Sequence, residues 1–523
     1  SRSIRDCTLS CLSMGVDPPL TECGALGSVG FPGPNATSAF FFRRADMMQE
    51  SSEHGATRIE HDSLGSREIP SHAYYGIQTQ RAVENFPITG VTIGTLPHLI
   101  RALALVKKAA ARANMDLGIL PKDIGQAICR ACDDLIGDKY HDQFVVDVIQ
   151  GGAGTSTNMN ANEVIANLAL EYLGYEKGDY AHCHPNDHVN LSQSTNDAYP
   201  TAIRLALYTK IDELTVAMAE LKTAFESKEV EFADIIKMGR TQLQDAVPMT
   251  LGQEFGTHAV TIGEDIARMH EAKKLLREMN LGATAIGTGI NAPEGYADIV
   301  RQHLNELGHL SFVTAYNLVE ATQDTGVFVQ LSGVLKRFAV KLSKSCNDLR
   351  LLSSGPRAGL NEINLPPMQP GSSIMPGKVN PVIPEVVNQI CFQVIGHDVT
   401  ISMAAEAGQL ELNVMEPIIL FSLYRTIEML TQACRTLARR CIIGITANED
   451  ICRRHVEMSI GLVTALVPVL GYDRASLIAH KALKTGKSVT AVALEEGVIS
   501  KEELEDLLRP ENMLRQKRIA KAP

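Results

Sequence analysis

Apolar residues recur every three or four positions through long stretches of the chain, and this spacing predicts amphipathic helices. Such stripes run through residues 207–225, 255–269, 328–342 and 420–441, and a further long helix is expected over 381–405. A mean spacing of about 3.5 residues lets helices pack nearly parallel, so the five helices are expected to form one elongated bundle. Alternating strand patterns are nearly absent. The fold class is therefore predicted to be mainly α.

The stripes themselves are assigned to the core and not to chemistry. A bundle of five helices with wide apolar faces has more apolar surface than one copy needs for its core. Further stripes can pack against other copies of the same chain, so self-association is expected.

Composition and charge narrow the function classes. The chain has 523 residues, 45% of them hydrophobic, and a net charge of −11. This charge argues against an extended nucleic-acid or acidic-membrane surface, and no apolar run reaches the roughly 20 residues that span a bilayer. Eleven scattered cysteines predict reduced thiols in a cytoplasmic protein. The pair Cys129 and Cys132 lies in a predicted helix over 124–135 and is interpreted as two helix neighbours, not as a redox or zinc site.

Residues 1–46 differ from the rest of the chain. They are rich in Gly, Pro and Ser, lack a helical period and begin with Ser. Their apolar patch at 39–42 is too short for a signal-peptide core. We interpret residues 1–54 as a disordered extension or a mis-assigned start, with Met47 or Met48 as the true beginning. A divergent transit peptide is the remaining alternative.

One segment, residues 371–381, has the sequence G-S-S-I-M-P-G-K-V-N-P. Its glycines let the backbone bend and move, and a loop with that freedom can close over a ligand. Its hydroxyls, together with Lys378 and Asn380, are donors that suit an anion. Taken alone, the segment is better explained as a capped turn between two helices.

Three more polar segments interrupt the helices, at residues 150–160, 192–197 and 239–245. A single Ser, Thr, Asn or Asp is enough to cap a helix, and Asp197 fits that simpler interpretation. Each segment, however, carries several such residues. Hydroxyls and amides at helix starts bind carboxylates through side-chain donors, free N–H groups and the helix dipole. The four segments together therefore predict a carboxylate-binding site.

Two other patterns carry little weight. The segment 371–378 has five residues, not the four of a phosphate-binding loop, between its glycines, and Val379 replaces the required Ser or Thr. The histidine-rich run 182–188 has crowded ligands and no second Cys/His pair at the spacing of a zinc finger. We interpret both patterns as structural.

Taken together, the four segments resemble the active-site motifs of the fumarase/aspartase superfamily. Residues 371–381 match the pattern G-S-S-x-M-P-x-K-x-N-P, and 154–160, 194–197 and 241–246 match the other motifs in the family's order. The resemblance runs from about Glu60 to the C-terminus and leaves residues 1–50 uncovered.

Within the superfamily, the run Q-G-G-A-G-T-S-T from Gln150 is similar to the aspartase branch, where fumarases usually have S-G-T-Q-S. Fumarases and some aspartases carry histidine at the position of Gln242, whereas other aspartases are similar to this chain there. Gln242 therefore does not count against the aspartase branch, and it removes that histidine as a base.

The resemblance implies three mostly helical domains, over residues 55–195, 196–450 and 451–523. It also implies a homotetramer whose active sites each draw on three subunits. Ser372 is the implied general base, and Lys378 favours its alkoxide. The remaining residues are implied to bind the substrate: Thr155, Ser194, Thr195 and Ser373 at the β-carboxylate, Thr241, Lys378 and Asn380 at the α-carboxylate, Asn196 near the amine, and Gln242 and Met375 elsewhere in the pocket.

The implied activity is the reversible elimination of ammonia from L-aspartate to give fumarate. No cofactor is required by this chemistry, and activation by a divalent cation such as Mg²⁺ is expected without an assigned site. Hydration of fumarate is the nearest alternative activity. A non-catalytic structural protein that reuses the fold is another alternative, but it predicts damaged motifs, and all four motifs are intact. Neither nucleic acid nor membrane is expected as a partner.

Overall fold

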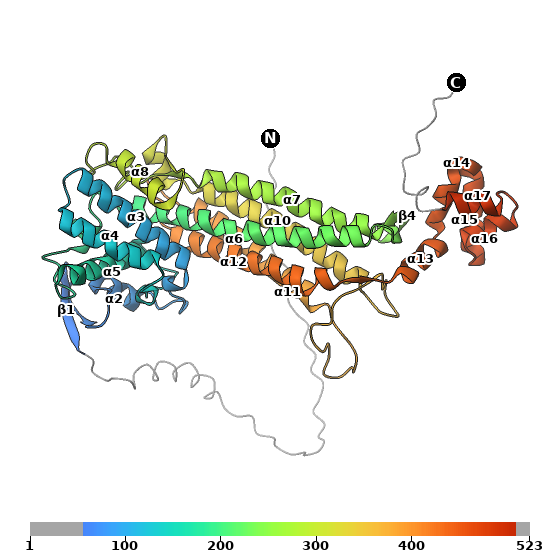
Figure 1. Cartoon of the computed structure of the whole chain (residues 1–523), viewed down its shortest axis with the longest axis horizontal. Coiled ribbons are helices and arrows are strands. Elements are labelled where there is room, and N and C mark those ends of the chain that lie inside the picture. The colour runs from blue at the N-terminus through green and yellow to red at the C-terminus, as the bar shows by residue number, and fades with distance from the viewer. Residues whose placement is uncertain (1–55, 509–523) are drawn as a thin grey trace, which may run out of the picture. The chain divides into compact units, whose positions relative to one another are not determined.

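Five long helices pack side by side in a closed ring in which each contacts the next (Figure 1). The computed structural model describes residues 56–508. In ring order the helices are α6 (Thr195–Glu231), α7 (Leu251–Leu275), α10 (Gly326–Leu352), α11 (Val382–Glu406) and α12 (Glu416–Arg440). The predicted mainly helical class and its central five-helix bundle are confirmed.

Local signals in the sequence determine where the bundle helices begin. Ser194 and Thr250 each form a capping box at the start of α6 and of α7, which satisfies N–H groups that have no partner inside the helix. Pro417 lies in the first turn of α12, where a missing N–H costs nothing. The apolar stripes are buried between the helices, Leu214 and Leu335 among them. Burial of these stripes holds the bundle together.

Shorter elements cover the end of the bundle at which α6 begins, on the left in Figure 1. Helix α3 packs against α4, α6 and α8, and α5 packs against α2, α4 and α6. The elements of this region are β1 (Thr57–Asp62), β2 (Gly65–Pro70), α2 (Ile77–Asn85), α3 (Pro97–Asp116), α4 (Lys122–Ile136), α5 (Thr155–Leu173), β5 (Glu278–Met279), α8 (Tyr296–Gly308), β6 (Val313–Thr314) and α9 (Leu318–Gln323).

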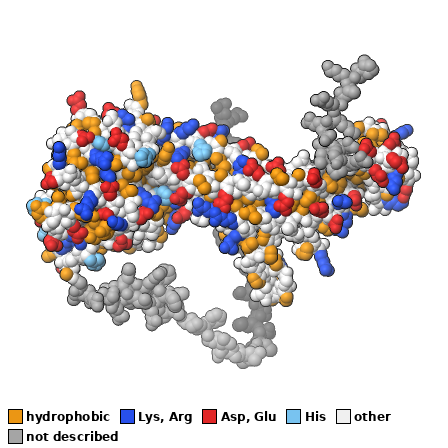
Figure 2. Space-filling model, viewed as in Figure 1, with side chains coloured by type: hydrophobic (Ala, Val, Ile, Leu, Met, Phe, Trp, Pro, Cys, Tyr) orange, Lys and Arg blue, Asp and Glu red, His pale blue; other side chains and the backbone are white. Residues whose placement is uncertain are grey.

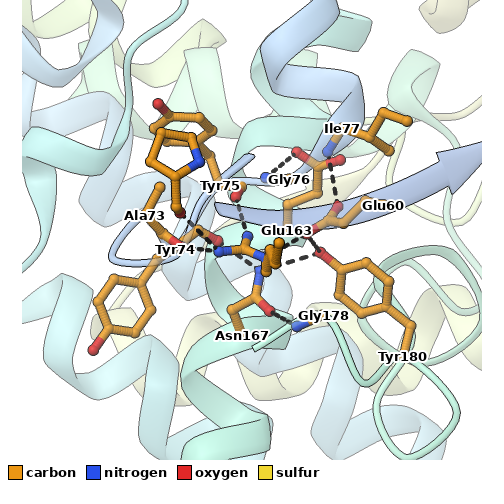
Figure 3. Close-up of polar contacts among 12 residues, drawn as sticks. Glu60, Ala73, Tyr74, Tyr75, Gly76, Ile77, Glu163, Asn167, Gly178 and Tyr180 are labelled. Carbon is orange, nitrogen blue, oxygen red and sulfur yellow. Dashed lines mark hydrogen bonds and ion pairs between the residues drawn. The ribbon is translucent and has the colours of Figure 1, made fainter. Parts of the chain in front are cut away.

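Two buried carboxylates fix α2 against α5 (Figure 3). Glu163 of α5 accepts hydrogen bonds from the backbone N–H groups of Gly76, at 2.9 Å, and of Gln78 and Thr79 in α2. Glu60 of β1 accepts one from Ile77 at 2.9 Å, and Tyr180 donates to Glu60 at 3.1 Å. The free N–H groups at the start of α2 are thus satisfied by acceptors from two other elements.

At the opposite end of the bundle, on the right in Figure 1, two strand pairs and the C-terminal helices follow. Strand β3 pairs antiparallel with β4, and β7 pairs antiparallel with β8. The elements are β3 (Ile236–Thr241), β4 (Gln244–Thr250), β7 (Ile363–Asn364), β8 (Thr446–Ala447), α13 (Glu449–Met458), α14 (Val467–Leu470), α15 (Tyr472–Thr485), α16 (Val489–Glu495) and α17 (Lys501–Leu507).

Residues 239–245 precede helix α7 without forming its start. They form the tip of the β3–β4 hairpin, whose two turn residues Gln242 and Leu243 have φ values of 54° and 61°. Helix α7 begins only at Leu251 and is capped by Thr250. A two-residue turn with positive φ matches the twist of a hairpin, and this geometry places Thr241 and Gln242 on a projecting tip.

The remaining predictions concern the cysteines, membrane-spanning helices, the N-terminal residues and the domain boundaries. Cys129 and Cys132 lie on α4, and the eight cysteines within 56–508 are free thiols. None of the helices described is both long and apolar enough to cross a membrane. The interpretation of residues 1–54 lies outside the described residues. The division into three domains at 195 and 450 stays a prediction.

Candidate active site

The first group of predicted site residues lies where α5 and α6 begin. Ser194 and Thr195 line a cavity of about 550 Å³ together with Asn186, Asn190 and Ala285. Thr155 is the first residue of α5, and α5 contacts the start of α6. The structure therefore brings the segments 150–160 and 192–197 of one copy to the same end of the bundle.

Hydrogen bonds within the chain fix the start of α6. Ser194 Oγ accepts from the backbone N–H of Asn196 at 3.2 Å as part of its capping box. The side chain of Asn196 donates to the carbonyl of Ala285 at 2.7 Å. Thr195 Oγ1 accepts from the amide of Asn158 at 3.1 Å. Each of these polar side chains is thus held in one orientation, and Ser194 and Thr195 are held so at the cavity wall.

One residue behind this wall was missed by the sequence analysis. Lys107 of α3 is buried and donates to Asn158 Oδ1 at 2.7 Å and to Asn190 Oδ1 at 2.9 Å. Asn158 in turn holds Thr195. Burial lowers the pKa of Lys107 to about 7. A lysine inside a helix carries no local signal of function, because its contact with Asn158 exists only in the folded chain.

Asp197 is the second buried charge here. It accepts hydrogen bonds from the backbone N–H groups of Ser194 and Thr284, both at 2.9 Å, and of Gly282 at 3.2 Å. Burial raises the pKa of Asp197 to about 6, against the opposing effect of these hydrogen bonds. The simpler interpretation of Asp197 as a capping residue agrees with these contacts, which also join α6 to the segment around Thr284.

The second group lies between α10 and α11, in the segment that carries residues 371–381. Lys378 and Asn380 line a cavity of about 700 Å³ with Arg350, Asn361 and Asn364. The segment projects from the bundle and is mostly uncharged in Figure 2. Its apolar side chains Ile374, Met375 and Val379 are exposed, although a pocket-lining role was predicted for Met375. An exposed apolar loop next to a polar cavity is the arrangement expected of a lid before it closes.

Ser372 lies in a tight turn of this segment. Its Oγ accepts hydrogen bonds from the backbone N–H groups of Ile374 and Met375, each at 3.1 Å. The backbone of Gly371 pairs with Lys378 across the segment at 2.8 Å, and a Cβ at Gly371 would lie 2.3 Å from the Lys378 carbonyl oxygen. Asn380 donates to the Gly371 carbonyl at 2.7 Å. Glycine is therefore required at 371, and the turn presents two donors to one serine oxygen.

The remaining predicted residues are exposed. Ser373 and Lys378 lie on the projecting segment, and Thr241 and Gln242 on the hairpin tip. Both the hairpin and the segment lie at the end of the bundle where α6 finishes (Figure 1). Exposed donors bind an anion weakly in water, so these side chains need a further surface over them to form a site.

The two groups of residues are separated by the length of the bundle. Helix α6 has 37 residues, which at about 1.5 Å per residue span about 55 Å. Ser194 lies at one end of this helix, and the hairpin with Thr241 follows its other end. One copy of the chain therefore does not bring Thr195 and Ser372 together around a molecule the size of a dicarboxylate.

The structure offers no obvious place for a divalent cation. Within residues 56–508, no three or more His, Cys, Asp and Glu side chains cluster in a way that could hold a metal ion. His184 of the histidine-rich run caps the short helix η3 (Pro185–Val189) by accepting from two backbone N–H groups. Activation by Mg²⁺ thus remains a prediction without a site.

Comparison with known proteins agrees with this geometry. Residues 65–396 match a family model described as lyase, and residues 462–515 match the C-terminus of fumarase C. The aspartate ammonia-lyase of Helicobacter pylori (strain ATCC 700392 / 26695) is 60% identical over 87% of this chain and 98% of its own length. The aspartate ammonia-lyase of Escherichia coli (strain K12) is 54% identical over 87% of this chain and 96% of its own length.

Two solved structures share the fold. A fumarate lyase:delta crystallin from Brucella melitensis, bound to cobalt, superposes with a TM-score of 0.87 at 57% identity, over 88% of this chain and all (100%) of that one. A class II fumarase from Schistosoma mansoni has a TM-score of 0.83 at 35% identity, over 88% and 99% of the two chains. The predicted lyase class is confirmed, and the chain belongs to the fumarase/aspartase family of lyases.

Proposed function

We propose that this chain is an aspartate ammonia-lyase, which reversibly eliminates ammonia from L-aspartate to give fumarate. Relatives with that name are 60% and 54% identical to it over nearly their whole length. The observation that carries the chemistry is the pair of backbone N–H groups on Ser372 Oγ. Hydrogen bonds to a charged form favour that form, so these two donors lower the cost of the alkoxide. A serine becomes a useful base only when its alkoxide is stabilised in this way.

The hard step is removal of a proton from Cβ, since the adjacent carboxylate is already anionic and must accept more charge. Ser372 takes the Cβ proton, and the electron pair passes into the β-carboxylate as a dianionic aci form. The pair then returns to form the Cα–Cβ double bond while the C–N bond breaks and ammonia leaves. Fixed donors stabilise the aci form most when they are already oriented before the reaction.

The proposed donors form two groups, one for each carboxylate of the substrate. The β-carboxylate and its aci form are held by four hydroxyls, and the α-carboxylate by residues of the hairpin tip and the 371–381 segment. Asn196 lies next to the amine, and closure of the segment brings Met375 over the substrate and excludes water. The proposal requires no cofactor. Its residues are Thr155, Ser194, Thr195 and Ser373 for the β-carboxylate, and Thr241, Lys378 and Asn380 for the α-carboxylate, with Gln242 beside them.

The complete site forms between copies of the chain in a homotetramer. The length of α6 separates the two groups of residues by about 55 Å. The bundle also exposes apolar side chains along α11, among them Phe392, Val399 and Met403, and such rows mark surfaces for association. Antiparallel packing of two bundles brings the start of α6 in one copy next to the 371–381 segment of another.

The test is formation of fumarate, followed by its ultraviolet absorbance, with L-aspartate and then with L-malate as substrate. Turnover of aspartate with little turnover of malate supports the proposal. Preference for malate would instead assign the chain to fumarate hydration, the alternative that is favoured by its similarity to a class II fumarase. Turnover of neither, by a folded tetramer, would indicate a non-catalytic protein.

A further inference from the structure

Glu362 lies where several distant segments of the chain meet. Its side chain is fully buried, with 0% exposed. Its carboxylate is 2.7 Å from Nη2 of Arg240, 2.9 Å from Nζ of Lys237 and 3.1 Å from Nδ1 of His455. Lys237 also pairs with Glu254 of α7. We call Glu362, Lys237, Arg240 and His455 the Glu362 cluster.

The backbone of Glu362 is fixed independently of its side chain. Its N–H donates to the carbonyl of Leu352, the last residue of α10, at 2.9 Å. Its carbonyl accepts from the N–H of Asn448, which precedes α13, at 2.9 Å. Because its two backbone partners are the last residue of α10 and the residue before α13, Glu362 is a fixed point, and groups bound to its carboxylate take their position from it.

The β3–β4 hairpin is the segment that depends most on this fixed point. Lys237 and Arg240 both lie on β3, and Arg240 directly precedes Thr241 at the hairpin tip. A hairpin of two strands is marginally stable by itself. The ion pairs of Lys237 and Arg240 with Glu362 therefore help to determine where the tip of the hairpin lies. Arg240 is the residue next to Thr241, whose hydroxyl is proposed to bind the substrate.

Residues close to Glu362 along the chain line the second cavity. Asn361 and Asn364 line that cavity together with Lys378 and Asn380. A shift of Glu362 would move this wall and the hairpin at once. One buried carboxylate thus connects the two parts of the candidate site that lie at this end of the bundle.

The charge of Glu362 is maintained by its partners. Burial raises the pKa of this carboxyl, but the hydrogen bond from Arg240 and the charge of Lys237 outweigh burial and hold the pKa below its usual value. Removing one partner of a buried pair leaves the other charges uncompensated and is strongly destabilising. Glu362 is therefore charged at neutral pH, and the cluster is sensitive to the loss of any member.

We propose that Glu362 is a positioning residue for the substrate-binding hairpin: it fixes Thr241 and Gln242 in place without contact with the substrate. The inference rests on the proposed function for the role of Thr241. It goes beyond that function because it states that Glu362, a side chain outside the α-carboxylate site, sets the position of the groups that bind the α-carboxylate. Displacement of a binding group by about 1 Å can cost about 100-fold in rate, so a neutral side chain at 362 is expected to impair catalysis.

The experiment compares Glu362→Gln with a control matched for burial. Asp265 of α7 is also fully buried and faces two cations, Arg337 and Lys341, but lies in the bundle away from the hairpin. Asp265→Asn is expected to lower the melting temperature with an unchanged KM. Glu362→Gln is expected to raise KM at least about tenfold in a tetramer that still assembles. An unchanged KM in Glu362→Gln would overturn the inference.

A double-mutant cycle separates positioning from general destabilisation. If Glu362 acts through Thr241, the effects of Glu362→Gln and Thr241→Ala on kcat/KM are not additive, because the second change removes a hydroxyl that is already misplaced. Additive effects would overturn the inference. Should Glu362→Gln fail to assemble, Arg240→Gln replaces it, with the same rise in KM and the same non-additivity expected. Its failure to raise KM would be equally decisive.

The KM and kcat/KM of each variant are expressed as ratios to the wild-type values. They are measured with the substrate that the wild type turns over. Failure of the proposed function appears in the wild type itself, as absence of fumarate formation from aspartate. Failure of the present inference appears only in the variants. The two outcomes are therefore distinguishable in one set of assays.

Discussion

Two inactive variants of this chain are expected to restore each other's activity when they share a tetramer. Ser372→Ala removes the proposed base, and Thr195→Ala removes a donor at the β-carboxylate. The residues lie at opposite ends of a bundle whose helix α6 alone spans about 55 Å. In the proposed site, Ser372 therefore comes from one copy and Thr195 from another. A mixed tetramer can contain sites in which both residues are intact.

The recovery can be calculated from random assembly. In tetramers formed from equal amounts of the two variants, the copy that supplies Ser372 is intact in half of the sites, and the same holds for the copy that supplies Thr195. About one site in four is then complete, so activity should return to about a quarter of wild type. Each parent alone should be slower by about 10²- to 10⁴-fold, the size of effect expected of a base or an oriented donor.

The assay is co-expression of the variants with two different affinity tags, sequential purification of mixed tetramers and measurement of fumarate formation from L-aspartate. The matched control pairs Ser372→Ala with Lys378→Ala. Both of these changes lie in the same segment of one chain, so no mixture can contain a complete site and no recovery is expected. Verified mixed tetramers of the first pair that remain as slow as their parents would refute the division of the site between copies.

Three further outcomes are expected. Lys378→Ala should raise KM for aspartate and lower kcat, so that kcat/KM falls by roughly 100-fold. Both parameters change because the proposed roles of Lys378 combine α-carboxylate binding and alkoxide stabilisation. A lower kcat at unchanged KM in steady-state assays would contradict this. Gly154→Ala should lower the melting temperature far more than Gly174→Ala: both glycines have φ of +86°, but a Cβ at 154 lies 2.2 Å from the buried ring of Tyr199, whereas one at 174 meets nothing within 4 Å. Equal losses would exclude the clash as the cause. Burial raises the pKa of Glu163 from 4.5 to about 7, so its stabilising contribution is complete below pH 4.5 and is lost as the pH rises through 7, by about 3 kcal/mol. The melting temperature of wild type relative to Glu163→Gln should therefore fall between pH 5 and 8, and a rise would contradict the pKa.

The bundle was predictable because its signals are local. The stripe that begins at Leu207 and the cap at Ser194 lie within one helix and need no knowledge of the rest of the chain. The hairpin was missed for the opposite reason. Its turn uses Gln242 and Leu243 at positive φ, where Gly or Asn would have given the usual signal. The contact of Lys107 with Asn158 joins α3 to α5, and the connections of Glu362 join four segments. Neither the contact of Lys107 nor those of Glu362 can be recognised from the spacing of residues in the sequence.

The sequence also posed capping and substrate binding as competing interpretations of the same hydroxyls, and the hydrogen bonds remove that conflict. A hydroxyl has two acceptor positions and one proton. Ser194 caps α6, Thr195 binds Asn158, and Ser372 closes its turn, and in all three the oxygen is the acceptor. A side chain that accepts from its own chain still has its proton for a carboxylate, so the local bonds orient the donor without consuming it. For Ser372 the same arrangement favours loss of the proton, which is what a base requires. Thr155 differs, because its Oγ1 donates to the Gly152 carbonyl at 2.7 Å. In the proposed site it must rotate away from that carbonyl to bind substrate, so of these four hydroxyls Thr155 is the one whose orientation is expected to change when substrate binds.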